Sequence, residues 1–154
     1  MTPEDRLKEI GIELPPAPAP AANYVPFVRT GNLLVVSGQI PMTPDGKLAY
    51  QGRLGEGISV EEGYAAARQC ALNGLAQVRA ALGSLNNVVR VVRLGGFVQC
   101  TADFTQQPEV INGASDLMVE VFGEAGRHAR AAVGTNALPR GVATEVEMMV
   151  EVRD

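Results

Sequence analysis

The stretch SVEEGYAAARQCALNGLAQVRAALGSLNNVVRVVRLGGFVQC, residues 59–100, decides the fold because it places a long helix directly before a buried strand. Ser59 followed by Glu62 forms a capping box, and Gly83 suits a helix C-terminus, so a helix is expected between them. The segment 88–98 is rich in β-branched residues and nearly continuous in apolar character, which is typical of a central strand. The apolar stripe of the helix consists of Tyr64, Ala67, Ala71, Leu75, Val78 and Leu82.

Three strands are expected before this helix. The segments 24–30 (YVPFVRT) and 33–41 (LLVVSGQIP) flank Gly31-Asn32, which is a short hairpin signal. The turn sequence Pro44-Asp45-Gly46 predicts a third short strand that returns beside the second.

A second helix and two strands are expected after the central strand. Pro108 suits the first turn of a helix within 106–126. The strands 129–138 and 143–152 flank a turn sequence, so we expect them to pair as a hairpin. If residue 130 pairs with residue 149, Arg130 shares a sheet face with Glu145 and Glu147, whereas a one-residue change of turn length would reverse this.

The predicted order is β-β-β-α-β-α-β-β, an α+β domain of two layers in which both helices cover one face of a sheet. The strands at 33–41, 88–98 and 130–137 alternate poorly between apolar and polar residues, so the second face is predicted to be apolar too. Such a face needs a partner, and we therefore expect a closed symmetric homo-oligomer.

The chain divides into an N-terminal extension, residues 1–22, and one domain, residues 23–154. The extension combines a short amphipathic segment with the proline-rich run PPAPAPAA, which can form neither a helix nor an inner strand. Two interpretations stay open for it, a segment laid over the domain or a disordered tail.

The composition excludes several classes of protein. A chain of 154 residues that is 46% hydrophobic and 19% charged fits one soluble domain. The net charge of -4 disfavours broad attraction to nucleic acid or anionic membranes, and no apolar run reaches the roughly 18–20 residues that span a bilayer. Cys70 and Cys100 are isolated and the N-terminus lacks the apolar region of a secretory signal, so we expect a cytoplasmic protein with reduced thiols.

Cations gather in the stretch 126–133, GRHARAAV, which holds Arg127, His128 and Arg130. One histidine and two distant cysteines cannot build a structural zinc site, and the common phosphate-binding and nucleophile motifs are absent. A buried cation is either paired or binds an anion, and Arg suits a carboxylate. Two interpretations of Arg130 stay open, an ordinary cross-strand ion pair with Glu145 or an anion site. His128 and Arg127 are interpreted as loop residues.

Four segments follow the pattern of one family: TGNLLVVSGQIP at 30–41, FVQCTADF at 97–104, EVIN at 109–112 and HARAAVGTNALPRGVATEVEM at 128–148. On these motifs the chain resembles the RidA/YjgF family of small enamine/imine deaminases over most of 19–153. The resemblance implies a chorismate-mutase-like fold and a homotrimer with clefts between subunits. It also implies hydrolysis of 2-imino acids to 2-keto acids and ammonia, with no cofactor and no metal.

The resemblance implies roles for single residues as well. Arg130 would hold the carboxylate of the substrate, and Glu145 would activate the water and serve the leaving ammonia. Glu147 is a second candidate for the acid/base. The positions that match the substrate-binding residues of the family are Tyr24, Ser37, Asn112 and Ala132.

Several positions depart from the family pattern. Ala131-Ala132 stand where Ser-Cys is usual, Gly134 replaces a frequent glutamate, and His128 replaces a proline. The departures support a second hypothesis, a non-catalytic protein that binds a small carboxylate such as a keto acid. A third, an endoribonuclease or translation inhibitor, is disfavoured by the acidic charge and by the lack of aromatic residues among the basic ones.

Overall fold

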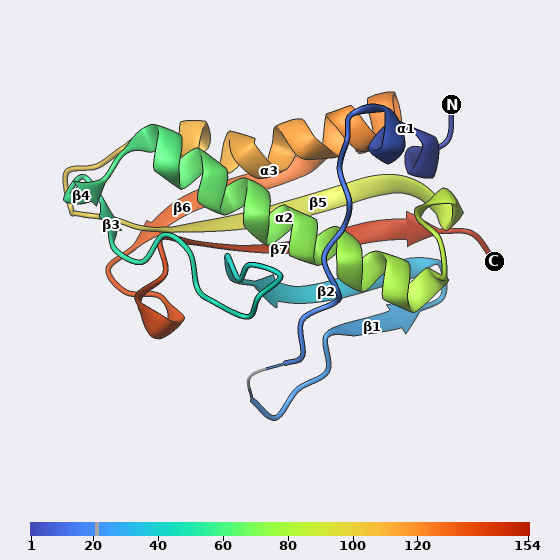
Figure 1. Ribbon diagram of the computed structural model, residues 1–154, viewed down its shortest axis with the longest axis horizontal. Helices are drawn as coiled ribbons and strands as arrows, with labels where there is room; N and C mark the ends of the chain where they lie inside the picture. The colour runs from blue at the N-terminus through green and yellow to red at the C-terminus, as the bar shows by residue number, and fades with distance from the viewer. Residues whose placement is uncertain (21) are drawn as a thin grey trace.

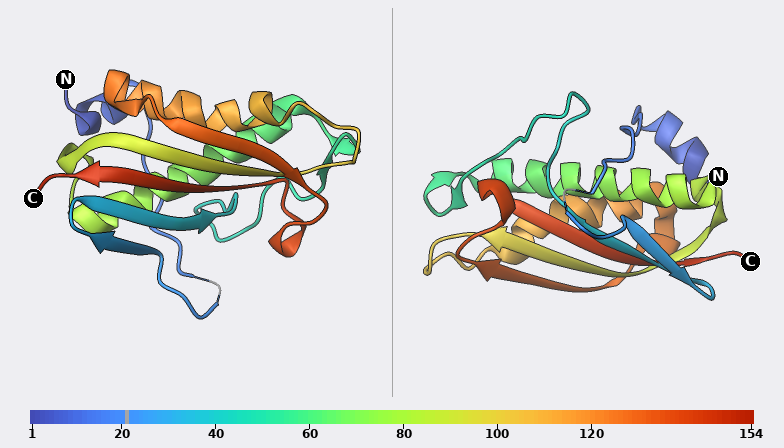
Figure 2. Two further views of the ribbon diagram at one scale, coloured as in Figure 1. Left: turned by 180° about the vertical axis from the view of Figure 1, so that it is seen from behind. Right: turned by 90° about the horizontal axis from the view of Figure 1, so that it is seen from below.

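The computed structural model describes residues 1–20 and 22–154, and Ala21, which falls in the predicted extension, lies outside the described residues. A five-stranded sheet forms one layer, and two long helices cover one of its faces (Figure 1, Figure 2). The predicted α+β class is therefore confirmed. Among the described residues, no helix is long and apolar enough to cross a membrane.

The sheet has the strand order β1-β2-β7-β5-β6, in which only β5 and β6 are parallel neighbours. A separate two-stranded parallel ladder, β3-β4, lies in the connection to the first long helix. The strands are β1 (Phe27–Thr30), β2 (Leu33–Gln39), β3 (Arg53–Leu54), β4 (Gly57–Ile58), β5 (Val88–Gln99), β6 (Ala129–Thr135) and β7 (Thr144–Val152). The helices are α1 (Pro3–Glu9), α2 (Val60–Leu82) and α3 (Gln107–Phe122), with short 3-10 turns η1 (Leu85–Asn87), η2 (Gly123–Gly126) and η3 (Pro139–Gly141).

Helix α2 begins and ends where the sequence predicts. The hydroxyl of Ser59 accepts from the N–H of Glu62 at 3.1 Å, and the Glu62 carboxylate accepts from the N–H of Ser59 at 3.0 Å. Gly83 closes the helix in the left-handed region with a φ of 82°. The hydrophobic residues of α2 that are fully buried are Ala66, Ala67, Cys70, Ala71, Leu75 and Val78. Because most of them are small, α2 lies close against the sheet.

Glycines allow helix α3 to approach both α2 and the sheet. A Cβ on Gly113 would collide with the carbonyl oxygen of Tyr64 in α2. A Cβ on Gly96 in β5 would come within 2.6 Å of the Ile111 side chain in α3. The missing side chain of Gly96 thus lets Ile111 of α3 pack directly on the backbone of β5.

Two predicted strand pairings are wrong. The segment around Pro44-Asp45-Gly46 forms only the isolated bridge between Met42 and Leu48, with no third strand beside β2. The last two strands form no hairpin, because β5 lies between β6 and β7 and pairs with both. Helix α3 is the reason. It carries the chain back from the end of β5 to its start, so that β6 runs parallel to β5.

This strand order separates two residues that were expected to share a face. Arg130 is aligned with Leu94, whose partner on β7 is Met148, and both of these are buried beneath the helices. Glu145 is aligned with Phe97 on the opposite face of the sheet. Because aligned residues of neighbouring strands point to the same face, Arg130 lies on the helix side and Glu145 on the open side. The predicted shared face was wrong.

The open face of the sheet carries exposed apolar side chains. Val28 on β1 is 53% exposed and Val133 on β6 is 47% exposed. Their strand partners Val35 and Phe97 lie on the same face and are partly exposed. These side chains give the open face an apolar character that a second copy of the chain could cover.

We expect Gly113→Ala to lower the free energy of unfolding by about 1–3 kcal/mol, the usual cost of overpacking. The added Cβ meets the backbone of Tyr64, which cannot move aside unless α2 shifts as a whole. Helix propensity acts in the opposite direction, since Ala is favoured over Gly by up to about 1 kcal/mol. Urea unfolding followed by circular dichroism measures the difference.

Gly74→Ala in α2 is the matched control. Its Cβ would meet the end of the flexible Met148 side chain, which can rotate away, so we expect a clearly smaller loss. Equal losses for the two variants would contradict the backbone contact between α2 and α3.

Candidate active site

The SGQ sequence at 37–39 forms a β-bulge in β2. The register against β7 shifts between Val36 and Gln39, so Ser37 and Gly38 together oppose the single residue Glu147. The hydroxyl of Ser37 donates to the carbonyl oxygen of Val25 at 2.7 Å and ties the bulge to the segment before β1. Bulges are frequent beside active sites because they redirect side chains.

The carboxylate of Glu145 occupies the space that Gly38 leaves. A Cβ on Gly38 would collide with Oε2 of Glu145, so only glycine accommodates the carboxylate in this position. Among the described residues, Glu145 forms no ion pair. Burial, and then the charge of Glu147, raise the pKa of Glu145 above its ordinary value. Glu145 therefore exchanges its proton closer to neutral pH than a surface glutamate does.

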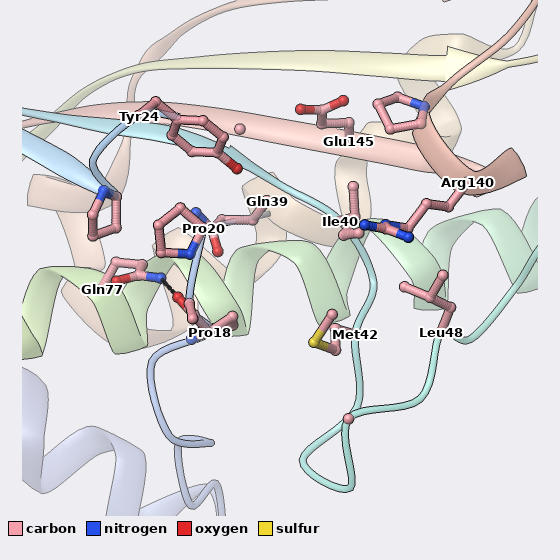
Figure 3. A pocket seen from close by; sticks show the side chains of 15 residues that line it. Pro18, Pro20, Tyr24, Gln39, Ile40, Met42, Leu48, Gln77, Arg140 and Glu145 are labelled. Atoms are coloured by element: carbon pink, nitrogen blue, oxygen red, sulfur yellow. Dashed lines mark hydrogen bonds between the residues drawn. The ribbon is translucent and has the colours of Figure 1, made fainter. Parts of the chain in front are cut away.

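Glu145 lines a cavity of about 270 Å³ between the bulge and η3. Figure 3 shows Tyr24 and Arg140 directed toward the same space. Arg140 has a φ of 58°, a left-handed conformation that residues other than glycine rarely adopt. The turn sequence around it predicts a bend, but it gives no sign that the bend borders a cavity.

Arg130 belongs to a second group of residues, on the other face of the sheet. Its Nη1 donates to Oδ1 of Asn112 at 2.9 Å and to the hydroxyl of Ser115 at 3.1 Å. Both partners are on α3, which faces this end of β6. These contacts hold the guanidinium in one orientation.

His128 extends the Arg130 group. Its Nδ1 lies 2.6 Å from the carbonyl oxygen of Gly126, and its Nε2 lies 2.8 Å from the hydroxyl of Ser115. A carbonyl only accepts, so the hydrogen bonds assign the proton to Nδ1, and Nε2 accepts from Ser115. Burial lowers the pKa of His128, and the charge of Arg130 lowers it further. His128 lies in the loop between η2 and β6, as expected, and it is a neutral, half-buried member of this network.

The other predicted residues divide between the two faces. Ala132 packs against the core on the side of Arg130. Glu147 lies on the side of Glu145 and forms an ion pair with Arg93 at 3.3 Å. The structure therefore brings together Tyr24 and Glu145 beside the Ser37 bulge, and separately Arg130, Asn112 and Ala132.

Residues 4–152 match the model of a protein family described as "YjgF/chorismate_mutase-like, putative endoribonuclease". The chain belongs to the YjgF family. Protein TCP17 of Trypanosoma cruzi is 52% identical to this YjgF chain over 149 residues, which cover 96% of the chain and 92% of TCP17.

Solved structures agree with the YjgF fold. The crystal structure of a putative endoribonuclease from Shewanella oneidensis superposes with a TM-score of 0.95 at 41% identity, covering 99% of this chain and 100% of the other. The structure of RidA from an Antarctic Psychrobacter has a TM-score of 0.63 at 31% identity and covers 88% of this chain and 94% of that RidA. The resemblance to the RidA/YjgF family that the motifs indicated is confirmed.

His128 is the only histidine in the chain, so one titrating imidazole signal in an NMR spectrum reports its pKa directly. We expect a value below the ordinary 6.5 or so, because burial and Arg130 both disfavour the charged ring. The unfolded chain then binds more protons than the folded one below about pH 6.5. The contribution of His128 to stability is therefore lost as the pH falls through this value.

Ser115→Ala is the variant that tests the assignment. It removes the hydroxyl that donates to the neutral ring, so the pKa of His128 should rise toward 6.5 or so. A wild-type value at or above this level, or no response to the substitution, would show that the network does not hold the histidine neutral.

Proposed function

We propose that this YjgF protein hydrolyses small 2-imino acids to 2-keto acids and ammonia, at sites that two copies of the chain build together in a cytoplasmic homotrimer. One observation carries the proposal. A guanidinium is fixed in place on one face of the sheet, and a carboxylate with a raised pKa lines a cavity on the other.

Arg130 suits the carboxylate of such a substrate. Arg carries five N–H donors in a planar fork, and Nη1 uses its two on Asn112 and Ser115. Among the described residues, Nε of Arg130 makes no hydrogen bond, and Nη2 has only a 3.5 Å contact with the carbonyl of Pro108. A carboxylate can therefore bind along the Nε–Nη2 edge in a bidentate way.

Glu145 suits the hydrolytic step. As a carboxylate it takes a proton from water, and the oxygen of that water forms a bond to C2 of the protonated imine. The proton then passes from Glu145 to the nitrogen of this adduct, the C2–N bond breaks and ammonia leaves. The proton of the C2 hydroxyl returns to the Glu145 carboxylate as the keto group forms. An acid/base whose pKa is raised toward the working pH performs these transfers better than an ordinary glutamate.

A single copy of the chain cannot present both groups to one small molecule. Arg130 and Glu145 are on opposite faces of the sheet, and strand β5 lies between their strands. A second copy must therefore supply one of them. The exposed apolar side chains of the open face, such as Val28 and Val133, support an assembly that covers this face.

Arg130→Ala and Glu145→Ala should each abolish the hydrolysis of 2-iminopropanoate and 2-iminobutanoate, made in situ by an amino-acid oxidase. Each variant lacks one of the two groups that meet the substrate. When the two variants are co-expressed, on the order of a quarter of the sites recover both intact residues, because each site draws them from different copies. The loss of imine, trapped as semicarbazone, measures the rate.

Either of two results would contradict this assignment. One is full wild-type turnover in Arg130→Ala. The other is inactivity of both single variants with no recovery in the mixture, at an unchanged molecular mass, which would place the whole site within one copy.

The decrease of the hydrolysis rate at acidic pH should reflect protonation of Glu145. We expect the rate to fall as the pH drops through its raised pKa, since the carboxylate form takes the proton from water. Glu147→Gln removes a like charge, lowers the pKa of Glu145 and moves the fall to more acidic pH. Glu151→Gln, on the same strand and face, is the control and should leave the profile in place. If the fall disappears in Glu147→Gln, Glu147 is the acid/base instead.

A second candidate function is the binding of a small carboxylate without catalysis. Ala132, next but one to Arg130 on the same face, presents only a methyl group where the family usually has a cysteine. Binding of a 2-keto acid in calorimetry, together with no imine hydrolysis by the wild type, would favour this function.

A further inference from the structure

We infer that residues 14–20, called here the N-terminal strap, form a wall of the Glu145 cavity and select ligands with a short aliphatic side chain. This inference deepens the proposed function and rests on it for the reaction. The preference for a short aliphatic side chain rests only on the cavity.

The strap is held to the domain at two places. The side chain of Leu14 is buried in the core, and the amide of Gln77 in α2, itself only 2% exposed, donates to the carbonyl oxygen of Pro18 at 2.6 Å. Figure 1 shows this part of the chain running across α2. Because the Gln77 amide is buried, its hydrogen bond to the strap fixes the point at which the strap crosses α2.

The segment before the strap is also anchored. Leu7 of α1 is 2% exposed, and Glu4 forms an ion pair with Arg79 of α2 at 2.6 Å. Glu4 also accepts from the N–H of Leu85 at 2.9 Å. These residues are not among those that line the cavity, so their contacts can be broken separately from the contact at Gln77.

The strap supplies one side of the cavity. Pro18, Ala19 and Pro20 line it, and Ile40 and Met42 come from the loop that follows β2 (Figure 3). The strap contains four prolines, at positions 15, 16, 18 and 20, whose fixed φ angles make it a stiff wall. The cavity therefore has an apolar part between strap and loop, and a polar part at Glu145.

The walls determine the class of ligand. Apolar side chains favour an aliphatic group, and Arg140 at the edge of the cavity repels a cationic one. A volume of about 270 Å³ lies below the usual range for ligand pockets, roughly 300–1,000 Å³, which leaves room for a few carbons only. The ligand is then a 2-imino or 2-keto acid with a short, uncharged aliphatic side chain.

Ala19→Phe tests the wall directly. Ala19 is exposed, so the larger side chain reduces the cavity without entering the core. We expect wild type to prefer 2-iminopentanoate to 2-iminopropanoate in kcat/KM. The variant should lose this preference by roughly tenfold or more, the usual effect of methylene groups in an apolar pocket.

Gln77→Met tests the anchor, because it keeps the length of the side chain and removes the donor to Pro18. We expect a smaller preference for the longer substrate, seen as a higher KM for 2-iminopentanoate. Arg79→Met is the matched control on the same helix. It breaks the ion pair with Glu4 and lowers the unfolding midpoint, but it should keep the wild-type substrate preference.

Calorimetry with pyruvate, 2-ketobutanoate and 2-ketopentanoate separates failure of the strap from failure of the reaction. If wild type hydrolyses no imine but binds the longer keto acids more tightly, and Ala19→Phe loses this order, the strap inference stands without the deaminase. If wild type shows no dependence on chain length, or if both strap variants keep it, the strap does not select the ligand.

Discussion

Strand β5 is hydrogen-bonded to β6 on one side and to β7 on the other, and the placement of the chemistry depends on this. Because α3 returns the chain to the start of β5, β6 must run parallel to it, and the last strand must pair along its other edge. Arg130 then lies against α3, whereas Glu145 lies on the open face. Residues close together in the sequence thus belong to two different surfaces of one copy.

Glycines allow the close packing that both surfaces need. Gly113 and Gly96 let α3 press on α2 and on β5, so that Asn112 and Ser115 of α3 reach Arg130. Gly38, within a bulge, leaves room for the Glu145 carboxylate. Close packing thus has a chemical result, since it orients a guanidinium on one face and buries a carboxylate on the other.

The sequence predicts those elements whose signals are local. The capping box at Ser59 and Glu62 starts helix α2, and the turn at 31–32 joins the paired strands β1 and β2. Both depend only on residues near them in the sequence, and both lie where expected. The turn at 138–141 is equally local and does form, but whether its flanking strands pair is decided by β5, which is remote in the chain. The same limit applies to the site. Family motifs indicated Tyr24, Glu145, Arg130 and Asn112, whereas Arg140 and His128 acquire their roles through tertiary contacts that no pattern predicts.

Division of the proposed catalytic groups between two faces links activity to assembly. A monomer would hold either a carboxylate-binding Arg130 without an acid/base, or an acid/base in a cavity without the cation that orients the substrate. Neither half binds and activates a small imino acid by itself, because orientation and proton transfer must act on the same molecule. In the proposed assembly, association through the apolar open face would therefore also complete the site. The substitution of cysteine by Ala132 leaves this division unchanged, because a methyl group there affects neither the guanidinium nor the distant carboxylate.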